Sequence, residues 1–424
     1  SIVRCIDKDG DGAADEITKF VPDVDSPRGL FYDNGTLWCL HPPDITAYYD
    51  RDGDGVAEES EVIVKGIAFD FTKRPADHTS NGLRMGIDGW LYMAIGDFGF
   101  HGAVAKDGTK LQLRGGGIVR VRPDGSELEL YAHGTRNTYD VAVDPFLNLF
   151  TRDNNNDGGG WGVRFSHIMQ MAEYGYPSLF KNFQDEIMHP LADYGGGSGT
   201  GAMYLHEPGF AGPYGNALFT CDWGRNKIYY HPLEPAGATF KATQETFVTI
   251  SRPTDMDVDG RSRLYLTSWR GGQYRYKGED VGYVVRLISP DKEQPEFPDL
   301  KKATDAELLK HLESPSYVCR LYTQREILRR KPTDQIVRGL EVLATGGAPL
   351  YSKVAGLFTL KQLLKTKSHE ALLRIAEEDD VREFALQALT DRKSEIEGVP
   401  AEPFIKALSD SNPRVQVAAL VGLA

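Results

Sequence analysis

The segment Gly86–Asp97, GIDGWLYMAIGD, sets the pattern for the first two thirds of the chain. Its Asp-Gly turn leads into an apolar strand, because the glycine tolerates the positive φ that such a turn needs. The same succession of strand, turn and aromatic-rich strand returns in LFYDNGTLWCLHPP (30–43), VDPFLNLFTRDN (143–154), NALFTCDWGRNKIYY (216–230) and DVDGRSRLYLTSW (257–269). Repeats of about 50 residues with four strands each are typical of propeller blades. We therefore predict an all-β, six-bladed β-propeller over residues 1–288, with its first blade incomplete.

A different pattern begins after residue 288. The polar stretch SPDKEQPEFPDLKK (289–302) contains three prolines and reads as a linker. Beyond it, apolar residues recur every three or four positions in paired segments that resemble HEAT repeats. We predict an all-α HEAT-repeat solenoid over residues 303–424. Because a repeat stack needs a capped end, we expect it to be incomplete at its C-terminus.

Composition excludes several classes of protein. The net charge is −13 and no Lys/Arg cluster breaks it, so we expect no nucleic-acid partner. No apolar run reaches the ~18–20 residues of a membrane helix, so we expect no membrane span in this chain. The four cysteines form neither CxxC nor CxxCH, which excludes a local zinc knuckle and an attached c-type haem. The chain starts at Ser1 without a methionine, so we expect a removed export signal or missing upstream residues.

Two acidic segments 43 residues apart, IDKDGDGAADE (6–16) and YDRDGDGVAEE (49–59), match each other closely. Alternate carboxylates around a glycine bend suit a hard cation with six or seven oxygen ligands. The alternative is a pair of solvated Asp-Gly turns. We predict calcium in at least one loop, with a structural role in a β context rather than an EF-hand. The predicted ligands are Asp7, Asp9, Asp11 and Asp15 in the first loop, and Asp50, Asp52, Asp54, Glu58 and Glu61 in the second.

Several loops between the strands carry polar side chains that a bare connector would not need. In a propeller, loops that lead into the innermost strands gather around the central axis, where function concentrates. The segments DHTSNG (77–82), HGTRNTYD (133–140), AEYGYPSLF (172–180), CDWGRNK (221–227) and SRPTD (251–255) belong to this set. A histidine, several arginines and a lysine would thus converge on one mouth. Such a set suits binding of an anionic cofactor and abstraction of a proton.

The motifs HTSNGLRMGIDGWLYMAIGD (78–97), YAHGTRNTYDVAVDP (131–145) and EYGYPSL (173–179) resemble the soluble quinoprotein glucose/sorbosone dehydrogenases. Those enzymes are six-bladed propellers that use pyrroloquinoline quinone (PQQ) and calcium. The segment DRDGDGVAEESEVIVKG (50–66), and a propeller that continues into HEAT-like helices, resemble more closely the large planctomycete-type membrane-bound dehydrogenases. Members of that group often end in a haem-binding CxxCH domain. The resemblance covers essentially the whole chain and is strongest over residues 1–290.

The resemblance implies roles for individual residues. His78 falls where the family has the general base that takes a proton from the sugar hydroxyl. Arg136 and Asn137 match an Arg-Asn pair that contacts substrate and quinone, and Gly175-Tyr176-Pro177 matches a turn whose carbonyls hold calcium. Partners for the quinone carboxylates, on a looser local match, are Arg225, Lys227 and Arg252. We expect Asp77, Asn81 or a backbone carbonyl to fix the His78 ring.

Two classes of function remain open. One is a periplasmic or secreted oxidoreductase that oxidises a sugar or polyol and passes electrons to a haem domain or a cytochrome c-type acceptor. The other is a non-catalytic, calcium-stabilised scaffold that binds glycans or proteins, with a protein partner on the HEAT surface. The local pattern around His78 and Arg136 favours the enzyme, while the missing CxxCH motif favours the scaffold.

Overall fold

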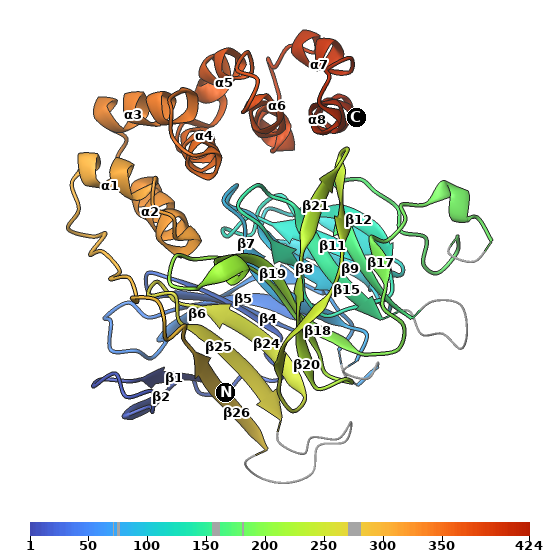
Figure 1. The fold of residues 1–424 in the computed structure, drawn as a ribbon, viewed down its shortest axis with the longest axis vertical. Coiled ribbons are helices and arrows are strands. Elements are labelled where there is room, and N and C mark those ends of the chain that lie inside the picture. The colour runs from blue at the N-terminus through green and yellow to red at the C-terminus, as the bar shows by residue number, and fades with distance from the viewer. Residues whose placement is uncertain (71, 74–76, 155–161, 180–181, 270–280) are drawn as a thin grey trace.

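The computed structural model describes residues 1–70, 72–73, 77–154, 162–179, 182–269 and 281–424. It is a β-propeller with a layer of helices across one end (Figure 1). The described residues form five blades. The first consists of β3 (Gly29–Asp33), β4 (Thr36–His41), β5 (Asp44–Tyr49) and β6 (Glu59–Lys65), and the second of β7 (Ser80–Met85), β8 (Leu91–Ile95), β11 (Gly116–Val121) and β12 (Glu129–Thr135).

The remaining blades follow in chain order. The third contains β13 (Asn137–Thr138), β14 (Ala142–Val143), β15 (Leu149–Asn154), β16 (Val163–Ile168) and β17 (Ala192–Asp193). The fourth contains β18 (Gly199–His206), β19 (Asn216–Asp222), β20 (Lys227–His231) and β23 (Glu245–Thr249), and the fifth β24 (Pro253–Val258), β25 (Leu264–Trp269) and β26 (Gly282–Leu287). Three further hairpins are β1 (Ile2–Ile6) with β2 (Glu16–Val21), β9 (Phe100–Ala105) with β10 (Lys110–Leu113), and β21 (Leu233–Ala236) with β22 (Thr239–Ala242). The β9–β10 hairpin extends the sheet of the first blade, and the other two form separate two-stranded sheets.

The prediction of a propeller is confirmed, but the number of blades differs. We predicted six, and the described residues make five, because β1 and β2 form a sheet of only two strands. Each blade packs against the blades on either side of it, so a strand in the middle of a blade is buried on both faces. All five residues of β8 are buried for this reason, including Tyr92 and Met93.

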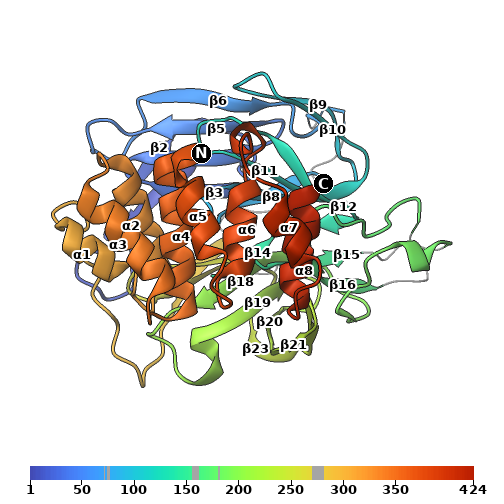
Figure 2. The ribbon, with the colours of Figure 1, turned by 90° about the horizontal axis from the view of Figure 1, so that it is seen from above.

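Eight α-helices follow β26 in the described chain. They are α1 (Asp305–His311), α2 (Tyr317–Arg329), α3 (Asp334–Thr345), α4 (Leu350–Leu364), α5 (His369–Ile375), α6 (Arg382–Thr390), α7 (Glu402–Ala407) and α8 (Pro413–Leu423). The first begins with a capping box between Thr304 and Glu307, which satisfies two backbone N–H groups. The helices run in an array across the propeller (Figure 2). That they are HEAT repeats stays a prediction. None of the helices in the described ranges is both long and apolar enough to cross a membrane.

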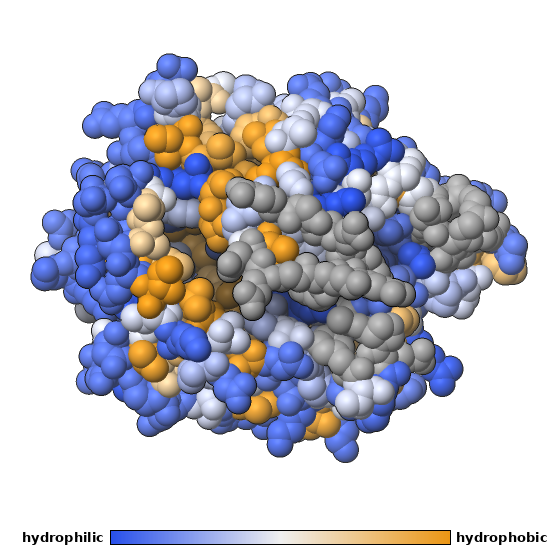
Figure 3. Space-filling model, turned by 90° about the horizontal axis from the view of Figure 1, so that it is seen from below, coloured by the Kyte–Doolittle hydropathy of each residue, from blue (hydrophilic) through white to orange (hydrophobic). Residues whose placement is uncertain are grey.

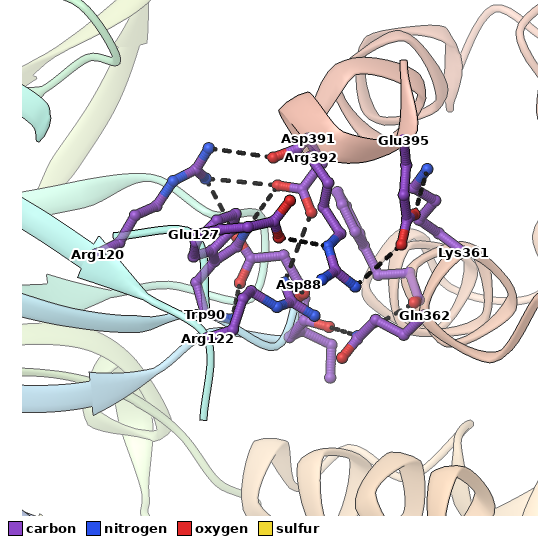
Figure 4. A network of polar contacts seen from close by, with 12 residues as sticks. Asp88, Trp90, Arg120, Arg122, Glu127, Lys361, Gln362, Asp391, Arg392 and Glu395 are labelled. Carbon is purple, nitrogen blue, oxygen red and sulfur yellow. Dashed lines mark hydrogen bonds and ion pairs between the residues drawn. The ribbon is translucent and has the colours of Figure 1, made fainter. Parts of the chain in front are cut away.

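Buried polar contacts join the helices to the propeller at the turns that follow the innermost strands. Figure 4 shows Asp391, after α6, between Trp90 and two arginines of β11 and its following turn. Trp90 Nε1 donates to Asp391 Oδ1 at 2.8 Å, and Arg120 Nη1 lies 3.4 Å from the same oxygen. Burial, and after it the charge of Asp391, raises the pKa of neighbouring Asp88 to about 6.

The same end of every described blade is covered. Arg329 pairs with Asp33 at the end of β3, Gln324 donates to the Ile87 carbonyl after β7, and Arg414 donates to Asn148 after β14. Val318 N donates to Glu207 after β18, and the linker residue Glu296 pairs with Arg261 after β24. The helices therefore close one end of the propeller, and the loops that lead into the innermost strands lie at the other end.

Candidate functional site

The predicted catalytic and cofactor-binding residues lie at the end of the propeller opposite the helices. His78 precedes β7, Arg136 precedes β13 and Arg252 precedes β24, so each stands where the chain enters an innermost strand. Figure 3 views the molecule from this end and shows a hollow with apolar residues along its walls.

His78 is held by a carboxylate that the sequence prediction missed. Its Nδ1 makes a short contact with Asp97 Oδ1, while its Nε2 lies 3.8 Å from Asp77 Oδ2. Phe98 stacks on the imidazole with ring centroids 5.2 Å apart. Of the expected partners of the ring, Asp77 lies beside Nε2, whereas Asn81 bonds Arg28 and the Thr79 carbonyl; the partner at Nδ1 is Asp97, which was not predicted. A carboxylate on Nδ1 fixes the tautomer and leaves Nε2 as the nitrogen that accepts a proton.

Arg136 and Asn137 lie at the start of the third blade, above a buried ion pair. Asp153 accepts the backbone N–H of Arg136 at 3.0 Å and pairs with Arg164 at 2.9 Å, with both side chains 1% exposed. Arg136 Nη1 donates to the Asn154 carbonyl, and its guanidinium carbon lies 5.9 Å from the centroid of the Tyr176 ring. The side-chain oxygen of Asn137 is buried and has no hydrogen-bond donor among the described residues. A buried unpaired acceptor is costly, so it marks a position where a ligand donor would be stabilised.

Two glycines bring the His78 and Arg136 loops close together. A methyl group on Gly116 would lie 2.7 Å from the carbonyl oxygens of both Arg136 and Ile95, which is closer than real side-chain contacts. A methyl group on Gly96 would collide with the backbone of His78. The register of the second blade agrees, because Ile95 pairs with both Ser80 and Gly117. Arg136 and His78 therefore belong to one cluster of loops.

The Gly175–Pro177 turn lies against the same cluster. A methyl group on Gly115 would stand 3.3 Å from the Tyr176 carbonyl oxygen and 3.2 Å from Pro177 Cδ. His133 and Glu173 hold this turn, since the His133 ring contacts the Glu173 carboxylate, and that carboxylate accepts the Gly175 N–H at 2.6 Å. The contact with Glu173 raises the pKa of His133. Its Nε2 contacts the Arg114 carbonyl, so both ring nitrogens are engaged and His133 serves to position the turn.

The three predicted partners of the quinone carboxylates lie at the same end, but their side chains are partly engaged. Arg225 donates to the Gly196 and Tyr194 carbonyls. Arg252 donates to the Trp223 carbonyl at 3.0 Å and stacks 4.0 Å above the Trp223 ring. Lys227 Nζ lies 6.0 Å from the centroid of the Tyr229 ring. An arginine has five N–H donors, which is more than the described residues engage on either guanidinium.

The two acidic loops fold alike, at the tips of the β1–β2 and β5–β6 hairpins. Carboxylate oxygens of Asp50, Asp52, Asp54 and Glu58 lie within 4.8 Å of one another, as do those of Asp7, Asp9 and Asp15. Asp11 accepts the Ala13 N–H and is not in the converging set, and Glu61 bonds Lys106 at 2.8 Å instead. Asp7 also pairs with Arg286 at 2.7 Å, so an arginine already neutralises part of the negative charge of the first loop.

The structure adds residues that the motifs did not single out. Asp97 ends the quoted segment GIDGWLYMAIGD, so its place after a buried strand was a usable signal. The Asp153–Arg164 pair and the His133–Glu173 pair depend on contacts between strands of one blade and its loops. The spacing of these residues in the sequence does not predict either pair. All four cysteines are free thiols, and Cys39, Cys221 and Cys319 are buried.

Comparison with known proteins gives one family and several distant structural likenesses. No curated protein matches the sequence. A PQQ-bound aldose sugar dehydrogenase from Streptomyces coelicolor shares 20% identity, with 63% of this chain and 82% of that chain covered and a TM-score of 0.46. A carbohydrate-active enzyme of family AA12 from Trichoderma reesei shares 12%, with 68% and 88% covered and a TM-score of 0.48. Residues 1–266, more than half of the chain, match the family described as "Domain of unknown function (DUF7133)", and the chain belongs to that family.

Proposed function

We propose that the open end of the propeller oxidises an alcohol group of a sugar or polyol, with His78 as the general base. The observation that carries this proposal is the His78–Asp97 pair at the loop leading into β7. A neutral imidazole accepts a proton near neutral pH, and a carboxylate on its other nitrogen stabilises the imidazolium that forms. The His78 side chain is 17% exposed, so it is oriented by its neighbours and still reachable by a ligand.

The residues around this pair fit PQQ as the electron acceptor. PQQ is a planar quinone that carries carboxylates, so it needs cations and hydrogen-bond partners. Arg136, Arg225, Lys227 and Arg252 supply positive charge at the same end of the propeller, and Asn137 offers an unpaired buried oxygen. When bound, PQQ would supply a two-electron acceptor, and the Gly175–Pro177 turn would offer carbonyl oxygens to a calcium ion.

The contributions of the chain itself follow from the geometry. His78 Nε2 takes the proton of the substrate hydroxyl, while Asp97 keeps the ring in the tautomer that can do so. Arg136, held by Asp153 and the Asn154 carbonyl, places positive charge where negative charge develops as the alcohol is oxidised. In this proposal the electrons leave to a haem domain or a cytochrome c-type partner, and the protein works in the periplasm or outside the cell.

Calcium in the acidic loops is a separate part of the proposal. The Asp50 loop is the better candidate, because four of its carboxylates converge and none of those four pairs with an Arg or Lys of the described residues. A hard cation there would neutralise the four carboxylates and fix the β5–β6 hairpin. In the Asp7 loop, Arg286 already neutralises part of the charge, so we expect weaker binding.

A non-catalytic scaffold is the second candidate function. The engagement of Arg225 and Arg252 with backbone carbonyls favours it, because those contacts stabilise loops without any ligand. The two candidates predict different behaviour toward PQQ. We expect the wild-type protein with calcium to bind one PQQ, followed by its absorbance, and Arg136→Ala to weaken binding at least tenfold. If PQQ does not bind, the quinone proposal fails and the scaffold remains.

A further inference from the structure

Arg164 lies on β16 in the interior of the third blade, where its side chain is 1% exposed. It stands directly opposite Asp153 on β15, and its Nη2 pairs with the Asp153 carboxylate at 2.9 Å. Burying two charges costs free energy that their attraction only partly returns, and an apolar pair of similar size often stabilises a core equally well or better. Stability alone therefore does not account for an ion pair at this position.

The Arg164 guanidinium also reaches two segments of the open end. Its Nη1 donates to the Tyr174 carbonyl at 2.7 Å, and its Nη2 donates to the Gly134 carbonyl at 3.1 Å. Tyr174 directly precedes the Gly175–Pro177 turn, and Gly134 lies two residues before Arg136. A guanidinium is planar and holds its donors in a fixed fork, so it fixes the positions of the two carbonyls relative to each other.

The same two segments are hydrogen-bonded to each other through their backbones. The Tyr174 N–H donates to the His133 carbonyl at 2.8 Å, and the Tyr176 N–H donates to the Gly134 carbonyl at 2.9 Å. Gly134 has a φ of +91°, and a methyl group there would lie 2.4 Å from the Gly175 nitrogen, so this close approach requires a glycine. The Gly134 carbonyl thus accepts both from the turn and from the buried guanidinium.

Asp153, the other partner of the ion pair, holds the Arg136 loop directly. Its two carboxylate oxygens accept the Arg136 N–H at 3.1 and 3.0 Å. The carbonyl of Asn154, the next residue of β15, accepts Arg136 Nη1 at 3.0 Å. The ion pair therefore holds the Arg136 loop through Asp153 and the Gly175–Pro177 turn through Arg164.

We infer that Arg164 is a positioning residue of the open end, which sets the separation between the Gly175–Pro177 turn and Arg136. This role rests on the proposed function, in which the turn offers carbonyl oxygens to calcium and Arg136 lies beside the quinone. Arg164 and Asp153 are each 1% exposed, so they act through these segments and not by contact with a ligand. A rigid, planar ligand binds tightly only where its partners already stand at the right separation. Arg164 therefore raises affinity by preorganisation.

Two variants separate this role from a contribution to folding. Arg164→Lys keeps a positive charge beside Asp153 but lacks the planar fork that reaches three acceptors. Asp153→Leu combined with Arg164→Met removes both charges, so neither is left buried without its partner. In the protein without ligand, we expect the Tyr176 amide to exchange with deuterium at least tenfold faster in both variants. Exchange of the buried β8 amides and the Tm should stay close to those of the wild type.

Arg152→Lys is the matched control. Arg152 also lies on β15 and pairs with Asp222 at 2.8 Å, and both side chains are 0% exposed. Asp222 accepts the backbone N–H groups of Ser198 and Arg225 at 2.9 and 3.0 Å, so this second ion pair holds a different loop. The control should leave Tyr176 exchange unchanged and instead accelerate exchange of the two amides that Asp222 holds.

Binding of PQQ with calcium, followed by absorbance, gives the second measurement. Arg164→Lys should weaken PQQ binding at least tenfold and leave the dependence of turnover on pH unchanged, because His78 belongs to another blade. Two results would overturn this role: wild-type Tyr176 exchange in a folded variant, or exchange that accelerates throughout the propeller together with a lower Tm, since the pair then serves folding alone. If the wild type binds no PQQ, the proposed function fails, and Tyr176 exchange still decides the role of Arg164.

Discussion

Replacing Asp391 with alanine should uncouple the helices from the propeller. The Asp391 side chain is 2% exposed and lies between two arginines that are 2% and 7% exposed. Removing it leaves Trp90 Nε1 without its acceptor and takes one negative charge from a buried network (Figure 4). Loss of one partner from a buried ion pair costs about 3–5 kcal/mol. Asp88 offsets part of this, because its pKa falls when the nearby charge of Asp391 is removed.

Urea unfolding measures this cost. Tryptophan fluorescence follows the propeller through buried Trp90, and far-ultraviolet circular dichroism follows the helices. We expect the two signals to coincide in the wild type and to separate in Asp391→Ala, with the helices unfolding first. The matched control is Asp379→Ala, because that side chain is 94% exposed and its pair with Arg382 is worth less than about 1 kcal/mol. A loss below 1 kcal/mol in Asp391→Ala, with coincident signals, would refute the reasoning.

Three further predictions concern pH, metal and the base. Burial raises the pKa of Glu207 from 4.5 to about 7, so the folded state binds the Glu207 proton more tightly than the unfolded state does. The free energy of unfolding should therefore fall by up to about 3 kcal/mol as the pH rises from 4.5 to 7. In thermal unfolding, Glu207→Gln should reduce this dependence on pH. Saturating calcium should stabilise the metal-free protein by about 2–4 kcal/mol, and Asp52→Ala should remove more of the rise in Tm than Asp9→Ala; no response to calcium would leave solvated turns. Asp97→Asn should lower turnover ~10²-fold or more and shift the dependence of turnover on pH, with PQQ binding unchanged. If the dependence on pH is unchanged, Asp97 does not position His78.

The repeated strands could be predicted because their signal is local. The segment GIDGWLYMAIGD becomes the turn after β7 and the buried strand β8, as the Asp-Gly turn and the apolar run indicate. The helices after residue 303 follow from their spacing and from the cap at Thr304. The number of blades was harder to predict. A count of repeats treats the β1–β2 hairpin as part of a blade, whereas in the described residues β1 and β2 pair only with each other.

The sequence predicted at which end of the propeller these side chains lie, but only part of the contacts that they make. His78, Arg136 and Arg252 lie at one end because each precedes an innermost strand, and that follows from the repeat. Their partners depend on distances across loops. Asp97 reaches His78 only because Gly96 allows close approach, and Arg252 finds the Trp223 carbonyl rather than a free position. A sequence states which donors exist but not which acceptors the folded chain brings to them.

The most direct test of the account is whether His78 acts as a base. The protein is reconstituted with PQQ and calcium, and dye reduction is followed with aldoses and polyols in wild type, His78→Ala and His101→Ala. His101 is the matched control, because it is exposed on β9 and its ring packs on Phe69. The account predicts that His78→Ala lowers turnover ~10²–10⁴-fold with PQQ binding nearly intact, and that His101→Ala has the wild-type rate. Equal rates in all three proteins would contradict it.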